Sequence, residues 1–181
     1  MLYMADRKTD DCQGCCQLEF DVLAANKPPA VDAGFWVQAT ASGEICGYDN
    51  GTGSISLAAE GLVPQGVYTV WFITDRGLKP AAPTDAVYTA DGSDPNRLVV
   101  NSAGVLNYYI APLDFNPLKG IPLSGSKVRA AIQGVIIGFH SNRTTNGIVP
   151  GDFNVNFFEQ LTAEICFLRT TADKVIGTED Q

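Results

Sequence analysis

Five cysteines carry the most evident chemistry of this 181-residue chain: Cys12, Cys15, Cys16, Cys46 and Cys166. Three of them crowd into residues 11–16 (DCQGCC), a polar segment without the alternation that would bury a thiol in a core. The Cys12-x-x-Cys15 spacing is that of a zinc knuckle, but no second CxxC and no histidine pair accompanies it. An odd number of cysteines favours pairing between chains, or one thiol left over.

The other two cysteines interrupt alternating apolar segments. Cys46 falls in phase with Glu44, opposite Ile45, and Cys166 falls in phase with Glu164. On strands, both side chains would therefore point away from the apolar stripe. Three alternatives follow: the two cysteines pair with each other on neighbouring strands, lie reduced under a loop, or accept arm cysteines from another subunit.

His140 is the only histidine, and it stands at the end of an apolar run. A Ser-His-Asp arrangement with Ser141 is disfavoured, because adjacent strand residues point to opposite faces. The sequence predicts a structural histidine that is hydrogen-bonded to loop backbone, with a catalytic or ligand role as the alternative. No enzymatic activity is predicted.

A possible calcium loop is formed by Asp91, Asp94 and Asn96, within residues 91–96 (DGSDPN). The spacing lacks the full EF-hand pattern. Asp and Asn are also ordinary turn residues, because their side chains satisfy nearby backbone donors. The turn is the favoured interpretation, calcium is the alternative, and no other cofactor is expected.

Charge and hydropathy exclude two classes of partner. Lys and Arg total 12 against 20 Asp and Glu, giving a net charge of −8. Such a chain lacks the basic surface that nucleic-acid binding requires. No apolar run approaches the roughly 20 residues of a membrane helix, so membrane insertion is not expected. No apolar signal-peptide core is visible at the start, which leaves a cytoplasmic location open.

Period-2 alternation dominates the rest of the chain. It predicts strands at 18–22, 34–41, 44–48, 54–59, 67–73, 97–101, 105–110, 128–139, 153–157 and 161–167. The Asp49-Asn50-Gly51 triplet indicates a hairpin. The predicted fold is an all-β antiparallel β-sandwich, jelly-roll-like. We expect a flexible N-terminal arm over residues 1–16, one domain over 17–171 and a loose tail over 172–181.

A polar arm with adjacent cysteines (Cys15-Cys16) ahead of an all-β body resembles the subunits of bacterial endospore appendage fibres. The resemblance implies that the arm reaches into a preceding subunit and is locked there by disulfides. Cys15 and Cys16 would be the tethers, and Cys46 and Cys166 the receiving positions. The body, with Gly61-Leu-x-Pro64-x-x-x-Tyr68 and the motif that starts at His140-Ser-Asn, is similar to microbial β-sandwich proteins of unassigned function.

These observations predict a structural subunit of a self-assembling extracellular filament or surface layer, located outside the cell or on a cell or spore surface. The subunits would be homo-oligomeric and joined head to tail through the arm and intersubunit disulfides. The alternative is a β-sandwich module that binds carbohydrate or calcium through its end loops.

Overall fold

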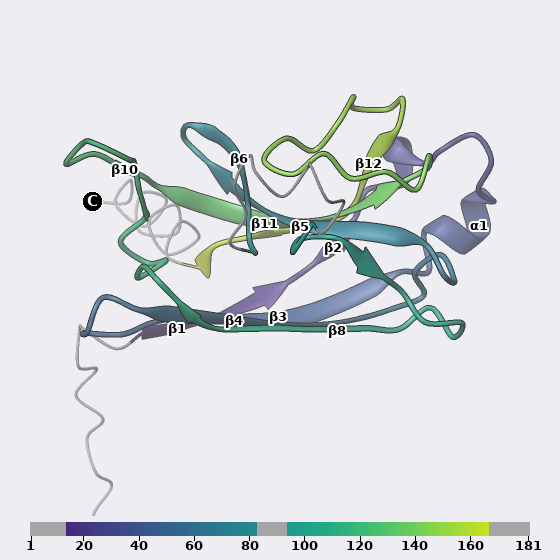
Figure 1. Cartoon of the computed structure of the whole chain (residues 1–181). Helices are drawn as coiled ribbons and strands as arrows, with labels where there is room; N and C mark the ends of the chain where they lie inside the picture. Colours follow the sequence, from purple (N-terminus) through teal and green to yellow (C-terminus); the bar gives the residue numbers. More distant parts are fainter. Residues whose placement is uncertain (1–13, 83–93, 167–181) are drawn as a thin grey trace, which may run out of the picture.

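The computed structural model describes residues 14–82 and 94–166, which form two antiparallel sheets packed face to face (Figure 1). This confirms the predicted all-β sandwich. The first sheet, sheet A, has the order β1-β3-β4-β8. Its strands are β1 (Gly14–Glu19), β3 (Thr40–Gly47), β4 (Gly53–Glu60) and β8 (Leu106–Leu113).

The second sheet, sheet B, has the order β2-β12-β11-β5-β6, and β7 also pairs with β5. Its strands are β2 (Asp21–Val22), β5 (Val67–Thr74), β6 (Gly77–Pro80), β7 (Leu98–Val99), β11 (Ile132–His140) and β12 (Phe157–Glu164). A two-stranded ribbon joins β9 (Ile121–Pro122) to β10 (Arg129–Ala130). Two short helical segments, η1 (Ala24–Asn26) and α1 (Ala33–Trp36), follow β2.

The main apolar core lies between the two sheets, where alternate residues of each strand meet. Sheet B is covered on its other face as well, since nearly every residue of β5 and β11 is buried. A second apolar cluster there contains Trp71, Ile136 and Phe157. The loop between β11 and β12 lies on this outer side of sheet B (Figure 1). The strand predicted at 67–73 is confirmed as β5, and the one predicted at 128–139 is confirmed over 132–139 within β11.

The strand predicted at 34–41 is wrong for its first half, which forms α1. Asp32 caps this helix: its side chain accepts a hydrogen bond of 2.9 Å from the backbone N–H of Phe35. The strand predicted at 153–157 is also wrong except for its last residue. The carbonyl of Asp152 accepts from the N–H groups of Val155, Asn156 and Phe157, so the backbone turns there instead of extending.

The hairpin predicted at Asp49-Asn50-Gly51 is confirmed and connects β3 to β4. Gly51 has φ of +82°, a conformation that favours glycine. The side chain of Asn50 accepts from the backbone N–H of Thr52 at 3.1 Å and so stabilises the turn.

The N-terminal strand begins earlier than predicted. β1 starts at Gly14, so Cys15 and Cys16 belong to sheet A and not to an arm that ends at residue 16. Only Phe20 separates β1 from β2, and at this residue the chain passes from sheet A to sheet B. Residues 1–13 of the expected arm and the expected tail over 172–181 lie outside the described residues.

Candidate functional site

The candidate site is centred on β1, which carries two adjacent cysteines at an edge of sheet A. Successive strand residues point to opposite faces, and the two cysteines follow this rule. Cys15 is exposed on the outer face, whereas Cys16 is 1% exposed and belongs to the core between the sheets together with Leu18. One strand therefore presents a cysteine sulfur to each side of the sheet.

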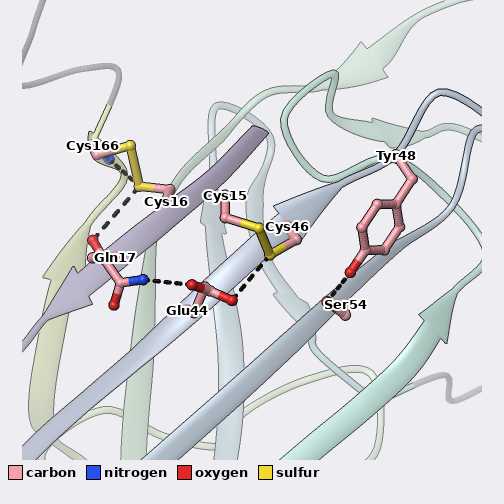
Figure 2. Close-up of a disulfide and its surroundings, with 8 residues drawn as sticks. All are labelled: Cys15, Cys16, Gln17, Glu44, Cys46, Tyr48, Ser54 and Cys166. Carbon is pink, nitrogen blue, oxygen red and sulfur yellow. Dashed lines mark hydrogen bonds between the residues drawn. A yellow bond between two sulfur atoms is a disulfide. The ribbon is translucent and has the colours of Figure 1, made fainter. Parts of the chain in front are cut away.

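Cys15 forms a disulfide with Cys46 of β3, its direct neighbour in the strand register. Their Cα atoms are 4.1 Å apart, and 31 residues separate them in sequence. Two positions further along, Gln17 lies opposite Glu44, and its side-chain amide donates to the Glu44 carboxylate at 2.5 Å. The other carboxylate oxygen, Oε1, lies 3.3 Å from Sγ of Cys46. These four side chains form one block on the outer face of sheet A (Figure 2).

Cys16 forms the second disulfide, with Cys166, at a Cα–Cα distance of 5.7 Å and a sequence separation of 150 residues. Cys166 follows the end of β12, so this bond ties β1 of sheet A to the end of a sheet B strand. The backbone N–H of Cys166 also donates to Sγ of Cys16 at 2.8 Å. Figure 2 shows the two bonds on opposite sides of β1.

The structure excludes two of the three alternatives that the sequence left open for Cys46 and Cys166. Cys46 and Cys166 do not pair with each other and are not reduced; each accepts one of the paired cysteines of β1. Cys46 lies beside Glu44 as predicted. The predicted outward direction of Cys166 is wrong, because β12 ends at Glu164 and the alternation does not continue. Cys12 lies outside the described residues.

His140 is buried in the outer cluster of sheet B. Its Nε2 lies 2.7 Å from Oγ1 of Thr69, which also accepts a hydrogen bond of 2.6 Å from the indole N–H of Trp71. The His140 ring packs against Phe157 with its centroid at 5.2 Å. The bond to Thr69 was not predicted; the predicted contact with loop backbone is present at Thr144, although Nδ1 makes no hydrogen bond of ordinary geometry. The arrangement is that of a neutral imidazole within an apolar cluster.

Burial lowers the pKa of His140 from 6.5 to about 4, so the folded chain resists protonation there. Between pH 6.5 and 4 the unfolded chain binds more protons at this residue, and stability must fall as the pH falls. We expect the free energy of unfolding to drop by about 3 kcal/mol over this window from His140 alone. Urea titrations at pH 7 and pH 4 on the wild type and on His140→Gln measure this contribution as a difference.

Comparing the wild type with His140→Gln cancels the contributions that other titrating groups make to the pH dependence of stability. Burial raises the pKa of Glu159, which acts in the opposite direction, but this carboxyl group is present in both proteins and cancels. The wild type should therefore lose more stability on acidification than the variant does. Equal losses in the two proteins would show that His140 is not titrating in a buried state.

The structure describes only two residues of the predicted calcium loop, Asp94 and Asn96. Asp91 lies outside the described residues. Oδ1 of Asp94 accepts from the backbone N–H of Asn96 at 2.9 Å, and Oδ1 of Asn96 accepts from the N–H of Val70 at 3.4 Å. The first is a local bond of a turn, whereas the second connects this segment to β5. Within 14–82 and 94–166, neither residue belongs to a group of three or more His, Cys, Asp or Glu side chains that could hold a metal ion.

Sequence reasoning missed Gln17 and Glu44 as neighbours of a disulfide, and Thr69 as the partner of His140. The contact of Gln17 with Glu44 could have been inferred, because pairing Cys15 with Cys46 in antiparallel register places Gln17 opposite Glu44. The second depends on β5 and β11 lying side by side, with Thr69 opposite Gly138 and so diagonally across from His140, which pairs with Val67. No spacing along the chain encodes that contact.

Three further findings bear on the class of protein. Two disulfides are consistent with an oxidising, extracellular environment. In the described part of the chain, no helix has the length and apolar character needed to cross a membrane. The chain matches no protein-family model, no curated protein sequence and no solved structure.

Proposed function

We propose that the chain is a structural subunit of a self-assembling filament or surface layer on the outside of a cell or spore. In this proposal the β1 segment of one copy completes sheet A of the next copy. The bonds Cys15–Cys46 and Cys16–Cys166 then form between the two copies instead of within one. The observation that carries the proposal is that both cysteines of one edge strand are bonded, one to each sheet.

The position of β1 in the fold supports strand exchange. β1 is an edge strand that pairs only with β3 in sheet A, over six residue pairs from Gly14↔Gly47 to Glu19↔Ser42. The same hydrogen bonds form whether β1 belongs to the same chain or to another copy. Along the described backbone, only Phe20 connects β1 to β2, and short connections of this kind favour exchange between copies.

The two disulfides would suit a joint that has to resist pulling. Backbone pairing alone leaves a six-residue strand free to dissociate. Covalent bonds on both faces would fix the strand to β3 and to the end of β12. A head-to-tail joint does not close on itself unless the rotation between subunits forms a ring, and it therefore extends into a filament.

The experiment asks whether the disulfides join one chain or two. Copies labelled with ¹⁴N and ¹⁵N are mixed in the reduced, unfolded state, then refolded and oxidised together. In Cys12→Ser, a Glu-specific protease cleaves after Glu19, Glu44 and Glu164 and gives separate peptides for Cys15 with Cys16, for Cys46 and for Cys166. Bonds between copies give linked peptides of mixed label as often as linked peptides of one label.

Linked peptides that carry a single label would overturn the proposal. If the disulfides form only within single chains, every linked peptide carries one label at all protein concentrations tested. Electron microscopy of the oxidised high-mass fraction provides the second measurement. Polymers should be present in Cys12→Ser and absent in Cys15→Ser/Cys16→Ser. Polymers that persist without Cys15 and Cys16 would contradict the locked joint.

A further inference from the structure

The outer face of sheet A, which points away from sheet B (Figure 1), is hollowed into an open groove with a volume of about 560 Å³. Small-molecule sites in proteins have volumes of about 300–1,000 Å³. The floor of the groove is β4, whose outward residues there are the small Ser56 and Ala58. The floor continues to Ser42, the neighbour of Ala58 on β3. Because these side chains are short, longer ones on the neighbouring strands rise above them.

The longer side chains border the floor on both sides. Ser56 pairs with Glu44 of β3 on one side and with Tyr109 of β8 on the other. Two strand spacings, roughly 10 Å, separate the backbones of these two residues. Gln17 of β1 donates to the Glu44 carboxylate at 2.5 Å and so fixes its position. Asn107 lines the groove on the same strand as Tyr109. The groove therefore has an aromatic ring on one side and an oriented carboxylate on the other.

Tyr109 offers a flat apolar surface at the groove, since its side chain is 72% exposed. The face of an aromatic ring carries partial negative charge and attracts the partially positive hydrogens of C–H groups. A sugar ring with equatorial hydroxyl groups has only C–H groups on its two faces, and its hydroxyl groups point sideways. Such a ring can stack on Tyr109 while its hydroxyl groups bind the polar side chains around it.

The charge of the face favours a neutral ligand. The four strands of sheet A contain Glu19, Glu44 and Glu60 but no Lys or Arg. Phosphate groups and acidic polysaccharides would be repelled by these carboxylates. An ionised carboxylate only accepts hydrogen bonds, and its bonds are stronger than those of neutral acceptors. The face therefore suits an uncharged ligand that is rich in hydroxyl donors.

We propose that the outer face of sheet A binds a neutral polysaccharide whose sugar rings carry equatorial hydroxyl groups, such as a polymer of β-linked glucose or xylose. One ring would occupy the groove, with a C–H face against Tyr109 and hydroxyl groups within reach of Glu44, Ser56 and Asn107. The site does not depend on exchange of β1 between copies, because Gln17 lies opposite Glu44 whether β1 comes from the same chain or another. It also differs in place from a carbohydrate site at the end loops of the sandwich.

Saturation-transfer-difference NMR tests the site, because it observes the sugar and works with protein of any size, single chain or polymer. Disulfide-bonded protein is titrated with cellohexaose and with xylohexaose, and we expect saturable binding. Tyr109→Ala should weaken binding by about tenfold or more, whereas Tyr109→Phe retains the ring and should bind within about threefold of the wild type. Glu44→Gln, which removes the charged acceptor, should weaken binding by about tenfold. Hexagalacturonate, which is acidic, should not bind.

Two further variants locate the site. Ser56→Ile fills the floor with a residue that strands favour, and should block binding. Phe153→Ala removes an exposed aromatic ring from the β11–β12 loop, on the outer side of sheet B, and should leave binding unchanged. Circular dichroism verifies that each variant is folded.

Four outcomes would overturn the proposal. The first is that neither neutral sugar binds to the wild type, and the second is that hexagalacturonate binds as tightly as the neutral sugars do. The third is binding that survives both Tyr109→Ala and Ser56→Ile. The fourth is binding that is lost in Phe153→Ala, which would place the sugar at the loops. None of these outcomes bears on whether the disulfides join one chain or two, so this proposal and the proposed function can fail separately.

Discussion

In a single copy, in which Cys16 pairs with Cys166 of the same chain, the variant Cys16→Ala/Cys166→Ala should lower the free energy of unfolding by about 5 kcal/mol, the estimate for a loop closed over a separation of 150 residues. The bond restricts the unfolded chain by roughly 1 kcal/mol more than the bond across 31 residues does. In the folded state it also connects the two sheets, and Cys16 is only 1% exposed, so the substitution removes packed atoms as well. Guanidinium unfolding under oxidising conditions measures the loss.

The other disulfide is the matched control. Cys15→Ala/Cys46→Ala opens a bond across only 31 residues, for which the expected loss is about 4 kcal/mol. Cys15 is exposed, so the packing loss is smaller as well. A buried-pair variant that is as stable as the wild type would show that Cys16 and Cys166 do not pair in the folded chain. A wild-type stability that rises with protein concentration would instead indicate bonds between copies.

Trp36→Ala should lower the free energy of unfolding by about 4 kcal/mol, the usual cost of emptying a buried tryptophan site. The side chain is fully buried, and its indole N–H donates to the carbonyl of Leu23 at 3.0 Å. Its ring meets Phe139 edge to face at 6.1 Å, and Gln160 donates to its backbone carbonyl at 3.0 Å. The site therefore joins α1 to sheet B.

Two variants separate these contributions. Trp36→Phe retains most of the ring packing and should cost roughly 1 to 2 kcal/mol through the lost hydrogen bond and the smaller ring. Val37→Ala, at the neighbouring position that is 43% exposed, should change the stability by less than about 0.5 kcal/mol. Urea unfolding measured by circular dichroism compares all three. Equal costs for Trp36→Ala and Val37→Ala would contradict a buried Trp36.

Much of the fold could be predicted because alternation reports burial directly. Residues 54–59 and 67–73 alternate or run continuously apolar, and they form β4 and β5. The prediction failed where a local bond competes with extended backbone. The side chain of Asp32 caps α1, so residues 33–36 form a helix. The carbonyl of Asp152 accepts three backbone hydrogen bonds, so the chain forms a turn ahead of β12.

The candidate site could be predicted only as a set of residues. Opposite faces for Cys15 and Cys16 follow from adjacency on a strand, and Cys46 keeps its phase because β3 extends to Gly47. Cys166 lies beyond the last residue of β12, where phase no longer applies. Its position near Cys16 depends on how the end of sheet B packs against β1.

The sequence by itself determined the all-β class and the phase of Cys46 with Glu44 on one face of its strand, because these follow from local periodicity, and it left open whether the cysteines pair. Only the tertiary structure decided which cysteines meet, because Cys15–Cys46 requires the β1–β3 register and Cys16–Cys166 requires the packing of two sheets. It also decided that Glu44 and Gln17 lie beside one disulfide and that Thr69 lies beside His140. Contacts between distant segments depend on the total burial of the fold, and no short stretch of sequence contains that information.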